Sequence, residues 1–253
     1  MRTTLYFRTT WIDTADFKVG QPVPAGTEIR FFTDHDATIG TAVIKENEIA
    51  IIEWLLRSQA RNLLLESLCL PLDSHTATAV REPVIDDSQM KPGDLDLLIC
   101  PPRRPDLSAA LQCKRVTVEV EADNCDQIRK LGDIKDVVLQ ANKQKQRYGF
   151  HQNYLAIIIQ SFVARRSSSE VIFRGITSGS LKQIYEFNYR DKVHDDVGVI
   201  FIDITQLTWQ SVDRMARVGV CVDRRAEMLL QPSRVTGRIE ELLRNRSIGG
   251  NQK

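Results

Sequence analysis

The sequence predicts an α/β fold in which helices flank a mixed central sheet, and three observations support this. Apolar residues recur at helical spacing in two long segments, residues 46–68 and 125–149. Between them, residues 93–99 and 110–116 alternate apolar with polar side chains, as strands with one buried face do. Residues 154–159 form an unbroken apolar run rich in β-branched side chains, which is typical of a strand buried on both faces.

The flanking segments are expected to add a β-rich lead-in and an α/β extension of the same domain. The lead-in, residues 1–45, has β-type stretches at 5–7 and 29–32, separated by glycines and prolines. The extension, residues 163–253, is expected to contain a short helix at 181–187, strands at 197–202 and 218–222, an amphipathic helix after Pro232 and a loose tail from Ser247.

The expected helix over residues 46–68 carries a carboxylate on its apolar side. The apolar side chains recur every three or four residues: Ile49, Ile52, Leu56, Ala60, Leu63 and Leu64. At about 100° per residue, Glu53 projects among them, where an acid is unusual without a partner or ligand. Glu53 is therefore a candidate site residue, and Glu48, nearer the helix start, is its rival. Alternatively, Glu53 lies at the edge of the apolar side and pairs with Arg57 one turn on.

The two alternating strands bring an acid, an amide and an ammonium group together. Asp94 and Asp96 share one face of the first strand, opposite the two leucines that follow them. Gln112 and Lys114 share one face of the second strand. The proline-rich connection favours antiparallel neighbours. Such polar side chains are costly on half-buried central strands unless they are paired or bind a metal.

Metal-dependent phosphodiester cleavage would account for these residue types. An acid on the first strand would hold a divalent cation, and an oxygen ligand two residues before a lysine would complete the protein's share of the coordination. Mg²⁺ prefers hard oxygen ligands, keeps several waters and can activate one of them as the nucleophile. The lysine would orient that water or neutralise charge developing on the phosphate.

The sequence Gly-Asp-Leu-Asp-Leu-Leu-Ile at 93–99, followed by Leu-Gln-Cys-Lys-Arg-Val at 111–116, resembles the core signature of the PD-(D/E)xK nuclease superfamily. That group includes many restriction enzymes, Holliday-junction resolvases and recombination exonucleases. The resemblance implies a restriction-endonuclease-like αβββαβ core, and the element order expected here agrees with it over residues 46–162.

The resemblance also implies roles for individual residues. Asp96 would be the principal metal ligand, with Asp94 as the alternate. Gln112 and the backbone carbonyl of Cys113 would give Mg²⁺ (or Mn²⁺) further oxygens, and Lys114 would position the water. Gln112 departs from the usual Asp or Glu two residues before the lysine. Because its carbonyl has no formal charge, metal affinity should fall.

Two further residues would come from helices. Nucleases of this superfamily commonly receive an extra acid from the helix before the sheet, for which Glu53 is the candidate. Gln144 and Tyr148 lie one turn apart on the second helix, a spacing that resembles the Gln-x-x-x-Tyr motif of recombination-type nucleases. In those proteins the motif helps to build the active-site wall, so Gln144 would line the site. The alternative is a polar helix flank that ends in an aromatic residue.

Composition and charge are ordinary for a globular protein. The chain has 34 Lys and Arg residues against 33 acids, so a DNA partner would have to meet a local basic patch. No apolar run approaches the ~20 residues that span a bilayer, and the start does not resemble a secretory signal. The 5 cysteines lack paired spacing. We therefore expect a cytoplasmic protein with reduced thiols and no membrane partner.

The sequence lacks the motifs that are typical of several other enzyme classes. It has no Gly-rich phosphate loop, no Gly-x-Ser-x-Gly elbow and no His-Glu-x-x-His. Its histidines are scattered, and the run at 34–36, Asp-His-Asp, is interpreted as a polar turn.

Three hypotheses follow. The first is a Mg²⁺-dependent deoxyribonuclease, cutting internally or from ends, for which a homodimer or a larger defence or repair complex is compatible. The second is an inactive nuclease-fold protein that serves as a nucleic-acid-binding or assembly module, with Gln112 as the trace of lost chemistry. The third is an α/β protein outside this superfamily whose Asp and Lys form a structural ion pair.

Overall fold

The computed structural model describes residues 8–13, 29–32, 48–57, 60–81, 94–120, 126–163, 176–206 and 216–249. Within these ranges, nine strands form one sheet in the order β2-β1-β9-β8-β7-β5-β4-β3, with β6 paired to β5. The strands are β1 (Arg8–Asp13), β2 (Ile29–Phe32), β3 (His75–Arg81), β4 (Asp94–Cys100), β5 (Ala109–Val120), β6 (Gln127–Arg129), β7 (Gln152–Val163), β8 (Gly198–Gln206) and β9 (Ala216–Arg224).

The sheet is mixed, as the sequence predicts. Strands β3, β4 and β5 are antiparallel neighbours, whereas β5, β7 and β8 run parallel. Strand β9 is antiparallel to both β8 and β1, and β2 runs parallel to β1 at the far edge. The central place of β7 explains the apolar run at 154–159, in which every residue is buried.

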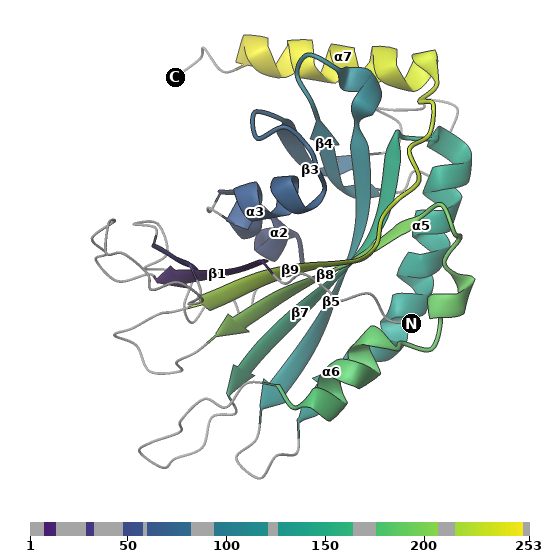
Figure 1. Cartoon of the computed structure of the whole chain (residues 1–253). Coiled ribbons are helices and arrows are strands. Elements are labelled where there is room, and N and C mark those ends of the chain that lie inside the picture. The colour runs from purple at the N-terminus through teal and green to yellow at the C-terminus, as the bar shows by residue number, and fades with distance from the viewer. Residues whose placement is uncertain are drawn as a thin grey trace.

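Helices cover both faces of the sheet (Figure 1). Helices α2 (Glu48–Arg57) and α3 (Ala60–Ser67) pack on one face, which we call the α2 face. Helices α5 (Ile134–Tyr148), α6 (Ser178–Tyr185) and α7 (Ser233–Gly249) pack on the other, which we call the α5 face. No helix within the described ranges is long and apolar enough to cross a membrane.

Two of the expected helices differ from the structure. The helix expected over 46–68 is divided into α2 and α3; both pack into the same core cluster, so their apolar repeat does not reveal the division. The helix expected over 125–149 begins only at Ile134, after β6 and a short 3₁₀ helix, Leu131–Asp133. The cause is Lys130, whose left-handed backbone (φ 67°) an α-helix cannot accommodate.

The sequence predicts a short strand at 81–85, within a loop-rich stretch, to open the three-strand unit. The structure describes this stretch only at Arg81, which is the last residue of strand β3 (His75–Arg81). Its threonine and valine side chains favour a strand. Residues 82–93 lie outside the described residues.

The flanking segments join the same sheet. Strand β2 confirms the expectation at 29–32, whereas the stretches at 5–7 and 34–36 lie outside the described residues. Strands β8 and β9 and helix α6 lie at the expected places. Helix α7 continues to Gly249, past Ser247, where a loose tail was expected.

Candidate functional site

The pairing of β4 with β5 ends early and leaves part of the β5 edge open. The two strands pair only from Leu97↔Leu111 to Ile99↔Ala109. Strand β6 pairs with β5 from Thr117 to Glu119, and β7 fills the opposite edge along all of β5. In the part of the chain that the structure describes, residues 112–116 of β5 therefore have no strand partner on the β4 side. We call this stretch the β5 gap.

Two carboxylates fill the β5 gap. The backbone N–H of Cys113 donates to Asp96 Oδ2 at 2.8 Å. The backbone N–H of Arg115 donates to Glu48 Oε2. Because the N–H groups of alternate residues point to the same side of a strand, the two acids lie side by side along one edge. They accept hydrogen bonds that the carbonyl groups of a neighbouring strand would otherwise accept.

A break in the side-chain alternation of β4 accompanies the position of Asp96. Leu97 packs into the core cluster of the α2 face, but Leu95 packs into a cluster on the α5 face. The expectation that these two leucines share a face was wrong. Strand β3 follows the break, because Val80 opposite Leu95 packs into the same cluster as Leu95. Asp96 lies at the break, where its carboxylate reaches the edge of β5.

The pKa of the Cys113 thiol reflects the negative charge near the gap. The thiol is buried on the α2 face, and burial raises its pKa well above the usual value. The nearby carboxylates of Asp96 and Glu48 raise the pKa further. The carboxylates of Asp96 on β4 and Glu48 on α2 therefore both lie near Cys113.

Gln112 and Lys114 project to the α5 face, as their positions between Ala110 and Val116 require. Gln112 is 2% exposed. Lys114 is half-buried, and its Nζ lies 3.7 Å from the carboxylate of Asp133, directly before α5. The ammonium group therefore sits at the start of α5.

Gln144 lies on the buried side of α5. It is 4% exposed and stands between Ala141, in the same core cluster as Val116, and Tyr148, in the same core cluster as Ala110. Tyr148 is itself buried and packs its ring against Phe150 at a centroid distance of 5.8 Å. Gln144, Gln112 and Lys114 thus lie on the same face of the sheet.

The structure places the two candidate acids of the first helix at different strands. Glu53 is half-buried and accepts a 3.5 Å hydrogen bond from Thr78 on β3. Glu48, its rival, reaches the β5 gap. Asp94 aligns with Arg81 in the β3–β4 register, whereas Asp96 reaches β5.

Three residues near the gap did not enter the expected site: Arg115, its contact Gln160 and Asp133, the partner of Lys114. Asp133 could not be found while the helix was expected to begin at 125. For the contact between Arg115 and Gln160, the sequence offers one signal: a polar residue, Gln160, directly after an apolar run.

The oxygen atoms at the gap suit a hard cation. Asp96 and Glu48 offer carboxylates, the Cys113 carbonyl points to the same edge as its N–H, and Gln112 offers an uncharged amide. Within the described residues, no group of three or more His, Cys, Asp or Glu side chains could hold a metal ion. A cation here would therefore depend on two carboxylates supplemented by neutral oxygens.

No protein-family model, curated protein or solved structure matches this chain.

Proposed function

We propose that the protein is a metal-dependent deoxyribonuclease whose site is the β5 gap. The observation that carries the proposal is the hydrogen bond from the Cys113 N–H to Asp96. It brings the acid of the first signature strand to the residue between Gln112 and Lys114 on the second. An acid on the first signature strand that reaches the second one next to its lysine position is the arrangement that the resemblance to PD-(D/E)xK nucleases implies.

The element order supports the same proposal. Helices α2 and α3 precede β3, β4 and β5; after the three-residue strand β6 come α5 and then β7, which is parallel to β5. A restriction-endonuclease-like αβββαβ core would have this order. On this proposal the gap is the place where the two signature strands separate.

Each residue at the gap would have a distinct task. Asp96, Glu48, Gln112 and the Cys113 carbonyl would hold Mg²⁺, which polarises a phosphate oxygen and lowers the pKa of a bound water. Lys114 would leave Asp133 by rotation of its flexible stem and stabilise negative charge on the phosphate. Gln144 would restrict the position of Gln112.

A specific observation favours a second candidate, an inactive nuclease-fold protein that binds nucleic acid. Both carboxylates already accept backbone hydrogen bonds, and Lys114 already has an acid partner. These contacts explain the half-buried charges without any metal. Gln112 would then be the trace of lost chemistry.

Cleavage assays of matched lysine variants test the proposal. Plasmid, linear duplex and single-stranded DNA are incubated with the full chain in Mg²⁺ and in Mn²⁺. Lys114→Ala should lower the cleavage rate by about 100-fold or more, as loss of a charge-stabilising group does. The control is Lys143→Ala, an exposed lysine on α5, which should cut like the parent.

Equal cleavage by the parent and Lys114→Ala would reject this site. Gln112→Glu separates the two candidates, because it restores the missing charge. If the site is active, Gln112→Glu should bind the metal more tightly than the parent. If neither the parent nor Gln112→Glu cleaves DNA, the second candidate is supported.

A further inference from the structure

Strand β6 runs back along β5 and stops at the boundary of the β5 gap. It is antiparallel to β5, and its last pair joins Arg129 to Thr117. A continuation of this pairing would place Lys130 opposite Val116, the nearest residue of the gap. The chain instead leaves the edge at Lys130, whose backbone is left-handed with φ 67°. This conformation lies outside the β region that a strand requires, so β6 approaches the gap without covering it.

The connection from β6 to α5 brings an acid to Lys114. After Lys130 comes the 3₁₀ helix Leu131–Asp133, in which the N–H of Asp133 donates to the carbonyl of Lys130 at 3.2 Å. The carboxylate of Asp133 lies 3.7 Å from the Nζ of Lys114. Within the described residues, neither of these two side chains has another hydrogen-bond or ion-pair partner.

Asp133 does not use its carboxylate to cap the helix that it precedes. It occupies the N-cap position of α5, where an aspartate commonly accepts a hydrogen bond from the first turn, but it makes no such bond. An acid near a helix N-terminus is favourable through the helix dipole alone, so its position does not require a contact with Lys114. The orientation of the side chain, rather than its place in the sequence, links Asp133 to β5.

The exposure of the two side chains suits a contact that can be exchanged. The Lys114 side chain is 20% exposed, whereas that of Asp133 is 56% exposed. Solvent screens such a pair, and exposed pairs contribute little to stability. Asp133 can therefore turn into water without leaving a buried charge, and the flexible stem of Lys114 can follow a new acceptor. While the pair is formed, Lys114 is not available to another anion.

We propose that Asp133 is the positioning residue of Lys114, and that it competes with a phosphate of bound DNA for the ammonium group. The inference rests on the proposed function in one respect, that the competing anion is a DNA phosphate. Asp133 holds Lys114 at the start of α5 in the resting state, and a phosphate that reaches Lys114 replaces the acid. Loss of the Asp133 charge should therefore make Lys114 more available.

The amine reactivity of Lys114 tests this restraint without DNA or metal. The full chain is treated in EDTA with a limiting amount of an acetylating reagent, and peptide mass spectrometry gives the rate at Lys114 relative to the exposed Lys143. Asp133→Asn should raise this relative rate about threefold, the factor expected for loss of a screened ion pair. Asp133→Glu keeps a carboxylate and should react like the parent. The matched control is Asp136→Asn, an exposed acid in the first turn of α5, which should leave the rate unchanged.

Metal-free DNA binding tests the competition with phosphate. Labelled duplex DNA is titrated in EDTA at fixed salt with the parent and each variant. Loss of any surface acid weakens the repulsion of DNA, so the effect of Asp133→Asn is compared with that of Asp136→Asn. Asp133→Asn should lower Kd about threefold more than the control does. In a Lys114→Ala background the two acid variants should change Kd equally, because no ammonium group is left for Asp133 to hold.

Three results would overturn the proposal. The first is an equal rate of Lys114 acetylation in Asp133→Asn and Asp136→Asn, and the second is an equal Kd of these two variants. The third is tighter binding by Asp133→Asn that persists in full without Lys114. Should Asp133→Asn fail to fold, Asp133→Ser, which keeps a residue suited to the N-cap, takes its place in both tests. A chain whose Lys114 reactivity follows Asp133 but which binds no DNA would refute the proposed function and the competition with phosphate, and would leave the restraint on Lys114 intact.

Discussion

At the scale of single residues, Asp96 and Glu48 replace a neighbouring strand as hydrogen-bond acceptors for the backbone of β5. Each accepts one backbone N–H in the β5 gap, so the strand keeps its hydrogen bonds without being covered by more backbone. A carboxylate that is held in this way is both a structural acceptor and a fixed negative charge.

These two roles of Asp96 can be separated by substitution. Asp96→Asn keeps an oxygen that can accept from Cys113, so the free energy of unfolding should fall by no more than about 1 kcal/mol. Asp96→Ala leaves that N–H without its acceptor and should cost roughly 1–3 kcal/mol. Both variants should lose cleavage if the charge holds a cation.

Urea unfolding of the two variants checks the order of stability, and DNA cleavage checks the shared loss. Asp191→Asn is the matched control, because its carboxylate is exposed on the 3₁₀ helix Arg190–Lys192. Equal stability of Asp96→Asn and Asp96→Ala would contradict the role of Asp96 as an acceptor.

At the scale of elements, the sequence predicted what depends on local pattern. The two signature strands, the buried strand β7 and the end of α5 all lie where the apolar pattern indicated. The left-handed backbone of Gly149 (φ 62°) ends α5 at the expected residue, and its N–H donates to Lys145.

Features set by tertiary position could not be predicted in the same way. Strict alternation put Leu95 and Leu97 on one face, but the alternation breaks between them and they pack on opposite faces. A helical wheel ranked Glu53 above Glu48, yet which strand each acid meets depends on how α2 crosses the sheet. Periodicity describes one element at a time, whereas the site is made where several elements meet.

The end of α5 offers a prediction at this scale. Gly149→Ala should lower the free energy of unfolding by about 1–2 kcal/mol, because an L-residue is strained at positive φ. The strain would act just beyond Tyr148, on the helix that positions Gln144. Gly132→Ala is the matched control: a Cβ there meets no atom within 4 Å, so stability should be unchanged or rise slightly. Thermal and urea unfolding measure both, and an equal effect at the two glycines would contradict this account.

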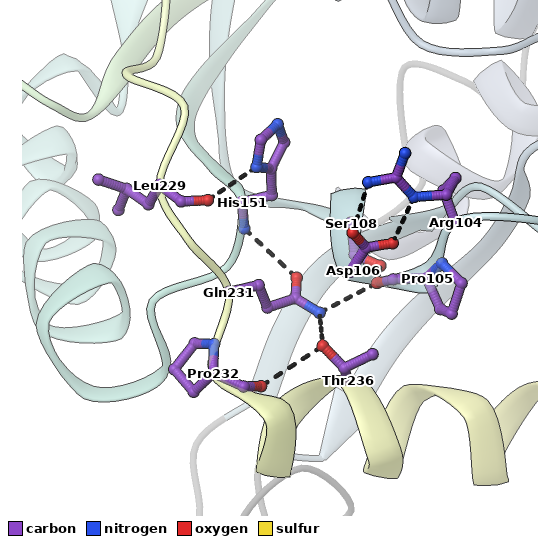
Figure 2. A network of polar contacts seen from close by, with 9 residues as sticks. All are labelled: Arg104, Pro105, Asp106, Ser108, His151, Leu229, Gln231, Pro232 and Thr236. Carbon is purple, nitrogen blue, oxygen red and sulfur yellow. Dashed lines mark hydrogen bonds and ion pairs between the residues drawn. The ribbon is translucent and has the colours of Figure 1, made fainter.

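At the scale of the whole molecule, the segment between β9 and α7 joins distant parts of the chain (Figure 2). The Gln231 amide donates to the carbonyl of Pro105 at 3.0 Å and to the hydroxyl of Thr236 at 2.9 Å. Its carbonyl accepts from the N–H of His151 at 3.3 Å. One side chain thereby links the β4–β5 turn, the start of β7 and the first turn of α7. Helix α7 then covers β3 and β4 with Val235 and Ile239.

Gln231 should therefore control how firmly α7 covers the strands that bear the site. Gln231 is 6% exposed, so Gln231→Leu would remove three hydrogen bonds at a buried position. The Pro105 carbonyl would keep Ser108 as a donor, whereas the His151 N–H would lose this acceptor. An unsatisfied buried group costs roughly 1–3 kcal/mol, and we expect a loss of stability in that range or somewhat above it. Hydrogen exchange should become faster in α7 and in β4 while β8 stays protected, because the link lies at one end of the sheet. Gln146→Leu, an exposed glutamine on α5, is the control and should change neither quantity. If α7 exchanges at the rate of the parent in Gln231→Leu, the apolar contacts of Val235 and Ile239 suffice to hold the helix and the amide link is dispensable.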